Sequence, residues 1–444
     1  MTWLILALSL ATASPDATAP SPATGPAGAW DPAELVPVPV PEPSGRAVDY
    51  YRSGLRLWFL VHAWGLFVPA VILFTGLSGR MRDLARRVGR TWYGTIAAYA
   101  LLYLGLTYLI DLPIDYYLGY VRPHAYDLSR QGLGRWLATG LKSLGITAVA
   151  AVALLWVPFL LLARSPRRWW LWAGLLMLPF VLFATWVKPI WIDPLFHTFG
   201  PMHDKALEAK ILRLAERAGV EGGRVFEVDM GRDTRTVNAY VTGLVGTKRI
   251  VLWDTLLARL DEKEVLAVVG HELGHYTLNH VAWGVTMSGL GSLVLLALID
   301  RAGRGLVARH GRRFGFDRLS DVAAVPLFVF LIQGLNLIGA PIPLAVSRTI
   351  EHEADRFALE ITRGNRSAAS AFVKLQGVNL SNPRPGLLSV LWRSSHPPIG
   401  DRIDFCNDYH PWTTGIPGRF DRLFVPTPRP SGLAGPAGAI HESR

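Results

Sequence analysis

The segment 271–275, with the sequence HELGH, carries the side chains of this 444-residue chain that are best placed to do chemistry. Two histidines four positions apart share one face of a helix, so both imidazoles can reach a single tetrahedral cation. Glu272 lies beside them and is free to act as a general base. Asp261 and Glu264 have the spacing of a capping box and start the helix. The pattern favours a zinc hydrolase site over a surface helix with incidental histidines.

A zinc hydrolase needs a third protein ligand and one open position for water. Glu351 is the candidate, and Asp355 lies one helical turn later, where it can orient a ligand imidazole through its second ring nitrogen. His352 is an alternative ligand in the same segment. Two imidazoles and a carboxylate favour zinc, although cobalt or manganese could occupy the same set in vitro. The lone Cys406 excludes an intramolecular disulfide and a thiolate cluster, and we interpret it as a packing residue rather than a nucleophile.

Composition places the chain in a membrane. Half of the residues are hydrophobic and sixteen are tryptophan. Six apolar stretches can span a bilayer as helices, and none contains Asp, Glu, Lys or Arg, which argues against a transporter or channel with an ion pathway through them. They lie at residues 57–77, 92–110, 143–163, 169–187, 281–299 and 322–346. The expected fold is mainly α: a polytopic bundle of membrane helices with a protease domain that carries a small β-sheet.

The topology of these spans brings the metal ligands together. The two histidines precede the fifth span and Glu351 follows the sixth, so two crossings return the chain to the same face of the membrane. A helix starting at Asp261 is expected to run without a break into the fifth span, which would place the site near the membrane surface. Pro341 and Pro343 are expected to kink or break the end of the sixth span, and a helix is expected over residues 348–362.

The distribution of charged residues predicts how the chain is oriented in the membrane. The net charge is +11, but the excess arginine is concentrated in short segments at residues 80–90, 164–168 and 301–318, between the apolar runs. This pattern reports topology and gives little support to nucleic-acid binding. All three segments fall on one face, which the positive-inside rule assigns to the cytoplasm. The catalytic residues are therefore expected on the extracytoplasmic face.

The remaining sequence suggests a simple organisation. Short strands are expected at residues 225–230, 239–244 and 249–253, the last two joined by a turn at Gly246-Thr247. The regions expected along the chain are a signal peptide or short anchor at 1–13, a Pro/Ala-rich linker at 14–54, a four-span membrane region at 55–187, a zinc metalloprotease region at 188–425 that includes the last two spans, and a disordered tail at 426–444.

Several motifs together resemble the CAAX prenyl protease 1 family of integral-membrane zinc endopeptidases of the gluzincin type. The resemblance extends from about Leu55 to Asp408 and is strongest from Pro194 onward. It rests on HELGH followed by Asn279-His280, the segment from Glu351 to Asp355, Val237-Asn238-Ala239-Tyr240, Lys248-Arg249-Ile250-Val251-Leu252, and Ser395-His396-Pro397-Pro398 with Arg402.

The resemblance implies roles for individual residues. It implies that zinc is bound by His271, His275 and Glu351, that Glu272 is the catalytic base, and that Asp355 is a supporting acid or proton donor. It also implies that Asn238 and Ala239 line an edge strand that pairs with an extended peptide, and that His396 and Arg402 contact the substrate.

We therefore predict a zinc metalloendopeptidase that works at a lipid bilayer on membrane-associated peptides or proteins, without a nucleic-acid partner. Prenylation of the substrate stays open, because the expected orientation is opposite to that of the eukaryotic relatives. The alternatives are a catalytically inactive protease-like membrane scaffold and a stress-response protease for membrane protein quality control.

Overall fold

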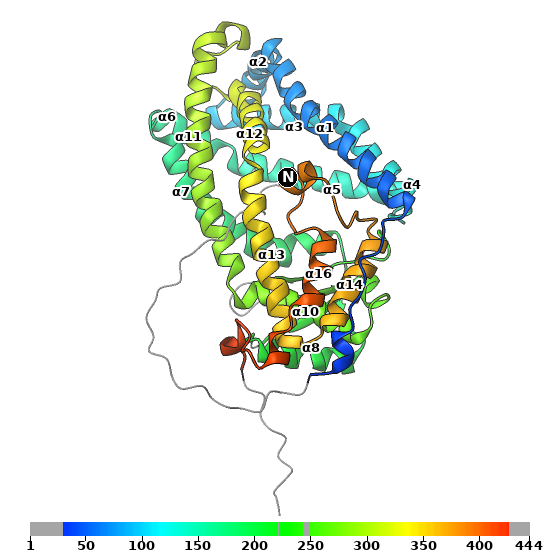
Figure 1. The fold of residues 1–444 in the computed structure, drawn as a ribbon. Coiled ribbons are helices and arrows are strands. Elements are labelled where there is room, and N and C mark those ends of the chain that lie inside the picture. The colour runs from blue at the N-terminus through cyan, green and yellow to red at the C-terminus, as the bar shows by residue number, and fades with distance from the viewer. Residues whose placement is uncertain (1–29, 221, 243–248, 426–444) are drawn as a thin grey trace, which may run out of the picture.

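The structure is a computed structural model that describes residues 30–220, 222–242 and 249–425 (Figure 1). The predictions for residues 1–13, for the tail at 426–444 and for the turn at Gly246-Thr247 lie outside the described residues. In the described part, six helical stretches are long and apolar enough to cross a membrane, which confirms the predicted bundle. They are α1 (Gly45–Phe74), α3 (Trp92–Tyr116) extending through α4 (Arg122–Ala125), α5 (Leu133–Leu154) with α6 (Trp156–Arg164), α7 (Trp169–Val187), α11 (His280–Phe314) and α12 (Val325–Gly339).

The membrane helices leave much of their apolar surface uncovered by protein. Only 6 to 33% of the residues in their most apolar windows are buried. Phe67, Leu109 and Phe183 are each more than half exposed, as expected of side chains that contact lipid tails. The amphipathic helix α2 (Leu77–Gly89) connects the first two spans.

The segments between α7 and α10 (Glu262–Thr277) form a small mixed sheet. Its strands follow the order β1-β2-β4-β3, in which β2 and β4 are parallel and the other pairs antiparallel. The expected strands near 225, 239 and 249 are confirmed, whereas β1 was not predicted because its three residues, Phe-Gly-Pro, carry no alternating pattern. The bounds are β1 Phe199–Pro201, β2 Arg224–Val228, β3 Ala239–Thr242 and β4 Arg249–Trp253, with α8 (Lys205–Arg217) before β2 and α9 (Asp254–Leu257) after β4.

Helix α10 (Glu262–Thr277) carries HELGH and begins with the predicted capping box. The prediction that it runs on into the fifth span is wrong. Helix α10 ends at Thr277, and Asn279 takes a left-handed conformation with φ of 57° before α11 begins at His280. Asparagine tolerates this conformation better than most residues, so the chain changes direction here although the sequence remains compatible with a helix on both sides.

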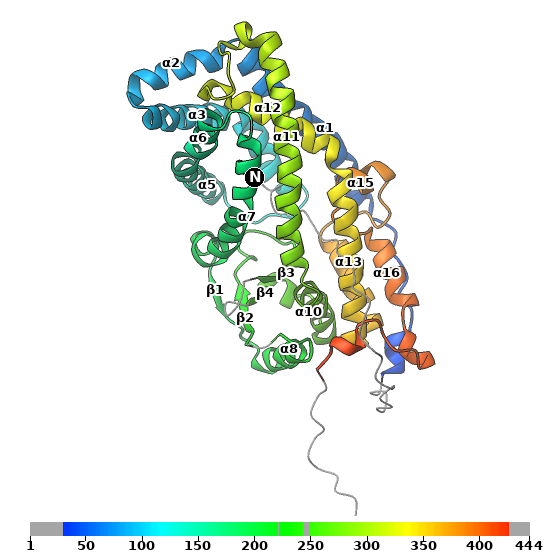
Figure 2. The ribbon, with the colours of Figure 1, turned by 90° about the vertical axis from the view of Figure 1, so that its left-hand side faces the viewer.

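Helix α13 (Pro341–Thr362) carries Glu351 and packs against α10 in the most extensive helix contact of the described chain (Figure 2). The sixth span ends at Gly339 rather than at residue 346, and α13 begins at Pro341 rather than at Arg348. Proline lacks the amide hydrogen that would continue α12, but it suits the first turn of a new helix. The predicted break of the sixth span near the two prolines is therefore confirmed, and it lies between Gly339 and Pro341, before the predicted end of the span at residue 346.

The C-terminal helices α14 (Asn365–Val378), α15 (Leu387–Trp392) and α16 (Ile399–Asp408) pack around α10 and α13. The described end of the predicted linker joins them. Glu34 is 7% exposed and accepts hydrogen bonds from the amide and hydroxyl of Ser367, and the carbonyl of Pro41 accepts one from Gln376. Residues 30–44 are therefore packed against the domain, and residues 45–54 belong to α1. Composition alone did not reveal these long-range contacts.

Candidate metal centre

Three side chains from two helices converge on one point. His271 and His275 project from α10 and Glu351 from α13, and one potential ligand atom of each lies within 4.8 Å of the others. The Nε2 atoms of the two imidazoles are 3.1 Å apart, and Nε2 of His271 is 3.2 Å from Oε2 of Glu351. The structure thus brings together the three residues predicted as ligands. His352, the alternative ligand, lies elsewhere and packs against the ring of Phe405 at 4.3 Å.

Glycines on α10 make this convergence possible. A Cβ added at Gly274 would stand 3.1 Å from Cβ of Phe357 and 3.3 Å from Cα of Ala354, both on α13. One turn earlier, a Cβ at Gly270 would stand 3.4 Å from Cα of Ala358. Without side chains at these two positions the helix backbones approach closely. The flanking imidazoles can therefore reach the carboxylate of Glu351.

The electrostatics of the three residues fit a divalent cation. Oε2 of Glu351 is buried without a hydrogen-bond partner of good geometry in the described chain. Burial lowers the pKa of His271, but hydrogen bonds to Asp355 and Glu351 outweigh it and raise that pKa to about 10. The carboxylates of Asp355 and Glu351 therefore favour a positive charge between the three side chains. A divalent cation held by the imidazoles of His271 and His275 and the carboxylate of Glu351 would supply this charge in place of the proton.

Asp355 and Arg402 brace the first histidine. Nδ1 of His271 lies 2.8 Å from Oδ1 of Asp355, and Arg402 donates to both oxygens of the same carboxylate at 2.6 and 2.8 Å. Burial raises the pKa of Asp355, but Arg402 and His271 hold it below its ordinary value. The carboxylate is therefore charged and fixes the orientation of the ring. The family resemblance implies that Arg402 contacts the substrate, but in the structure its guanidinium donates to the carboxylate of Asp355.

His280 braces the second histidine. Its Nδ1 lies 3.0 Å from Nδ1 of His275, which leaves Nε2 of His275 directed at the common point. The sequence pattern includes His280 but predicts no role for it, because the position of His280 depends on the break at Asn279. The imidazoles of His271 and His275 thus each have a separate hydrogen-bond partner at Nδ1.

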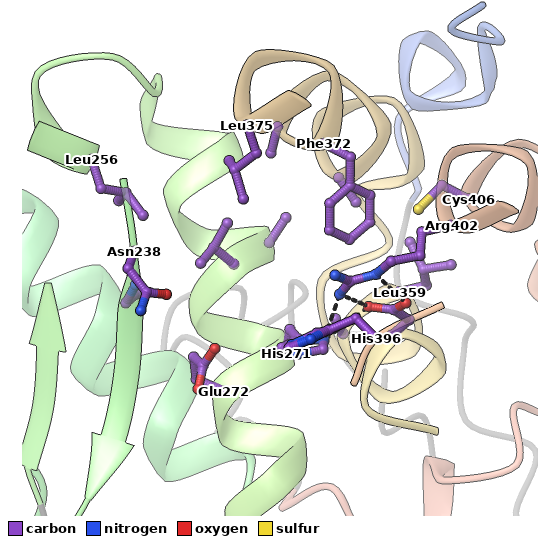
Figure 3. Close-up of a pocket in the computed structure, with 17 residues that line it drawn as sticks. Asn238, Leu256, His271, Glu272, Leu359, Phe372, Leu375, His396, Arg402 and Cys406 are labelled. Atoms are coloured by element: carbon purple, nitrogen blue, oxygen red, sulfur yellow. Dashed lines mark hydrogen bonds and ion pairs between the residues drawn. The ribbon is translucent and has the colours of Figure 1, made fainter. Parts of the chain in front are cut away.

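Glu272 lines a cavity of about 110 Å³, which His271 also lines. Asn238, Ala239, His396 and Arg402 line the same cavity (Figure 3). Burial raises the pKa of Glu272, and the imidazoles of His271 and His275 lower it. A raised pKa moves a carboxyl group toward the range in which it can exchange protons near neutral pH. Glu272 is on the side of α10 that faces Asn238, the residue just before β3, whereas His396 and Arg402 lie on the other side of His271 (Figure 3).

The other predicted contact residues also lie at this cavity. Strand β3, which starts at Ala239, is at the edge of the described sheet and pairs with β4 alone. His396 comes from the loop between α15 and α16, and its Nε2 lies 3.2 Å from Oε2 of Glu351 with half of the side chain exposed.

Cys406 is buried, and burial raises the pKa of its thiol well above the ordinary value. A protonated, buried thiol agrees with a packing role.

Comparisons with known proteins agree with this architecture. Residues 201–409 match the profile of Peptidase family M48, and residues 31–198 match that of the CAAX prenyl protease N-terminal region, described as five membrane helices. An uncharacterized metalloprotease of Bacillus subtilis, YhfN, is 35% identical over 84% of this chain and 87% of its own length. The CAAX prenyl protease 1 homolog of Arabidopsis thaliana is 31% identical over 66% and 69%, respectively.

A solved structure shares the fold. The crystal structure of Ste24p from S. mikatae superposes with a TM-score of 0.71 at 23% identity, covering 82% of this chain and 88% of that chain. The profile matches, the two relatives and the common fold cover both the membrane helices and the helices that carry the metal centre. The chain is therefore a multi-pass membrane metalloprotease that belongs to peptidase family M48 and to its CAAX prenyl protease 1 group.

Proposed function

We propose that the chain is a zinc endopeptidase in which His271, His275 and Glu351 hold the ion and Glu272 is the general base. The observation that carries this proposal is the convergence of the three potential ligand atoms within 4.8 Å, next to Glu272, whose carboxylate lines a cavity together with His271. Zinc bound there would lower the pKa of a bound water and polarise the scissile carbonyl. The two-imidazole, one-carboxylate donor set is typical of catalytic zinc.

The chain's own residues divide the remaining work. Glu272 accepts a proton from the attacking water and later delivers it to the departing amine. The free edge of β3, beginning at Ala239, pairs with the substrate main chain and orients it along the cavity. His396 lies close enough to the metal centre to donate to the carbonyl oxygen as negative charge develops there. Asp355, held by Arg402, keeps His271 in one orientation.

The proposed substrates are membrane-associated peptides or proteins, and the proposed active-site face is extracytoplasmic. The first is supported by α11, a membrane-span candidate that begins five residues after His275. The second is supported by the arginine-rich segments, which contact one another. Arg82 donates to the carbonyl of Gly315 at 2.9 Å, and Arg304 donates to the carbonyl of Pro166. Both views place α2 and the end of α11 at the opposite end of the molecule from α8 and α10 (Figures 1 and 2).

A cleavage assay with metal analysis tests the chemistry. We expect the purified protein to contain about one zinc and to cleave internally quenched peptides in a chelator-sensitive reaction. Glu272→Gln should keep the zinc but lower kcat roughly 10²- to 10⁴-fold, since it removes the proton acceptor. Undiminished cleavage by this variant would remove Glu272 from the mechanism, and a wild-type protein that holds zinc without cleaving any peptide would favour the scaffold alternative.

Reporter fusions test the orientation. A reporter placed after Arg87 should give a cytoplasmic signal, and one placed after Asn238 should give an extracytoplasmic signal. A cytoplasmic signal from the second fusion would reverse the proposed orientation.

A further inference from the structure

A second cavity, of about 540 Å³, lies between α1, the Arg122 end of the α3–α4 stretch and the segment that leads from α14 to α16. We name it the arginine cavity after its two charged lining residues, Arg122 and Arg393. Aromatic and polar side chains complete the lining, among them Tyr51, Trp58 and Asn379. The described residues that line it include no Asp or Glu. The cavity is therefore positively charged and shares no lining residue with the cavity at the metal centre.

The two guanidinium groups meet at one place. A Cβ added at Gly54 would stand 3.2 Å from Nη2 of Arg122 and 3.4 Å from Nη2 of Arg393. Arg122 is only 9% exposed, and its Nε has no hydrogen-bond partner in the described chain. No carboxylate within the described ranges forms an ion pair with either group. Arg122 donates hydrogen bonds to the carbonyl of Tyr50 and the hydroxyl of Ser53, and Arg393 donates one to the hydroxyl of Ser389.

Such an arrangement is unfavourable until an anion arrives. Two like charges that are partly desolvated repel each other. Arg122 lies over the ring of Tyr50 at 3.7 Å, but neither guanidinium has a carboxylate partner in the described structure. Burial lowers the pKa of Arg393, and the neighbouring Arg122 lowers it further. Guanidinium groups bind carboxylates through parallel, charge-assisted hydrogen bonds. The pair is thus organised to receive an anionic group.

Two chain segments connect the arginine cavity to the metal centre. Arg393 precedes His396 by three residues, a span of at most roughly 11 Å of extended chain, and His396 lies 3.2 Å from Glu351. On the other side, Asn379 accepts a hydrogen bond from the amide of Val237 at 3.3 Å. Val237 immediately precedes Asn238 and β3. The arginine cavity therefore lies next to the start of the proposed substrate-binding strand.

The direction of β3 decides which part of a peptide reaches the cavity. A peptide that pairs antiparallel with the free edge of β3 has its amino end near Thr242 and its carboxyl end near Ala239. Continuing past Ala239, the peptide leads toward Val237 and Asn379. The part of the substrate that follows the scissile bond is thus directed at the two arginines.

The orientation of α1 favours a peptide over a lipid headgroup. The α1 residues that line the cavity, including Tyr51, Gly54 and Trp58, form one stripe along the helix. Phe59, Leu60 and Phe67 lie on the opposite face and are 50 to 58% exposed, as expected for side chains in contact with lipid. The arginine cavity therefore opens away from the lipid-facing side of α1.

We propose that Arg122 and Arg393 bind a carboxylate on the carboxyl side of the scissile bond and so select the substrate. This inference rests on the proposed peptidase function and gives it a specificity. Two sources can supply the carboxylate: the free carboxyl terminus of a peptide cut close to its end, or an Asp or Glu side chain in a longer one.

A matched set of quenched peptides tests the proposal. The set shares one sequence and ends in a free acid, in a neutral amide, or in an amide preceded by Glu. We expect wild-type kcat/KM to be about tenfold or more higher for at least one carboxylate-bearing peptide than for the neutral amide. A preference for the free acid alone identifies the terminus, and a gain for the Glu peptide identifies a side chain. Equal kcat/KM for all three would overturn the proposal.

Arg393→Gln should abolish this preference. It should lower kcat/KM for the carboxylate-bearing peptides to the value of the neutral amide, whose cleavage stays unchanged. Arg393 is the better position to change because Arg122 also holds Tyr50 and Ser53. Arg366→Gln removes the same charge at an exposed site outside the cavity and should keep the wild-type preference. A preference that persists in Arg393→Gln would overturn the proposal.

Binding measurements separate this proposal from the proposed function. The Glu272→Gln variant should bind the favoured acidic peptide about tenfold more tightly than the neutral amide, whether or not any peptide is cleaved by the wild type. A wild-type protein that prefers the acidic peptide in binding but cleaves no peptide would contradict the peptidase function and leave the binding proposal standing. Equal binding of the acid and the amide would overturn the proposal. If the protein then also binds phosphatidylglycerol vesicles more tightly than phosphatidylcholine vesicles, and Arg393→Gln abolishes this difference, the arginine cavity is assigned to lipid.

Discussion

The metal centre and the arginine cavity hold buried charge in opposite ways. At the metal centre, Asp355 is 3% exposed, yet it is met by Arg402 and His271 together. In the arginine cavity, Arg122 is 9% exposed and lies beside a second guanidinium, without an acidic partner in the described chain. A buried charge that is paired inside the protein fixes geometry, whereas one left unpaired has binding energy available for a ligand. Under the two proposals, Asp355 and Arg402 help to build the active site, whereas Arg122 and Arg393 select its substrate.

Removing a metal ligand should have the largest effect. Glu351→Gln deletes the only carboxylate of the ligand set, so we expect metal affinity and kcat/KM to fall by more than the roughly 10- to 100-fold that loss of an outer partner costs. Metal content after dialysis and peptide cleavage measure both quantities.

Glu353→Gln is the matched control for this variant. Glu353 is two residues away on the same helix, but it pairs with Arg356 and Arg419 outside the metal centre. It should keep the metal and the activity. A Glu351→Gln protein with full metal affinity would show that α13 does not supply the third ligand.

Breaking the pairing behind His271 should have an intermediate effect. Asp355→Asn leaves the three ligands in place but removes the charge that orients the imidazole, and it leaves Arg402 buried without its partner. We expect metal affinity to fall roughly 10- to 100-fold. Competition with a chromophoric chelator measures this affinity.

The double variant tests whether the pairing itself matters. Arg402→Gln combined with Asp355→Asn should cost less than the sum of the single changes, since the two side chains act as a unit. Asp401→Asn on α16 removes an exposed carboxylate paired with Arg384 and should leave metal affinity unchanged. Strict additivity of Asp355→Asn and Arg402→Gln would mean that the two residues act independently.

The sequence predicted the convergence of His271, His275 and Glu351 better than the surroundings of these residues, for a physical reason. The spacing of His271 and His275 is a local property of one helix, and the number of intervening spans requires Glu351 to return to the same face. Their close approach at Gly270 and Gly274 could not be derived, since it depends on how α10 and α13 pack.

Other features depend on contacts between distant segments. The break at Asn279 places His280 behind His275, and no periodicity in the sequence marks it. Residues 30–44 have the composition of a linker, but the carboxylate of Glu34 finds Ser367 more than 300 residues away. The arginine cavity likewise joins Arg122, near the end of one membrane span, to Arg393 in the C-terminal region. Patterns along the chain cannot report such pairs.

The smallest effect is expected where neither chemistry nor substrate charge is touched. Asp261 caps α10 by accepting a hydrogen bond from the amide of Glu264, whose side chain in turn accepts one from the amide of Asp261. Asp261→Ala should lower the free energy of unfolding by about 1 kcal/mol. The cap lies almost three turns before His271, so metal affinity and the preference for a carboxylate should both remain at wild-type values below the unfolding transition. Thermal unfolding in detergent, followed together with metal content, measures the two effects.

Asp204→Ala provides the comparison, because Asp204 caps α8 by accepting from the amides of Ala206 and Leu207 at 3.0 Å, and α8 carries no ligand of the metal centre. Equal destabilisation by the two variants, with unchanged metal affinity in both, would show that loss of a helix cap does not by itself weaken the metal centre. The effects of Glu351→Gln and Asp355→Asn could then be assigned to charge rather than to unfolding. A selective loss of metal in Asp261→Ala would instead mean that the start of α10 positions the ligands. The effects of Glu351→Gln and Asp355→Asn on metal affinity would then have to be attributed in part to helix stability and not to charge alone.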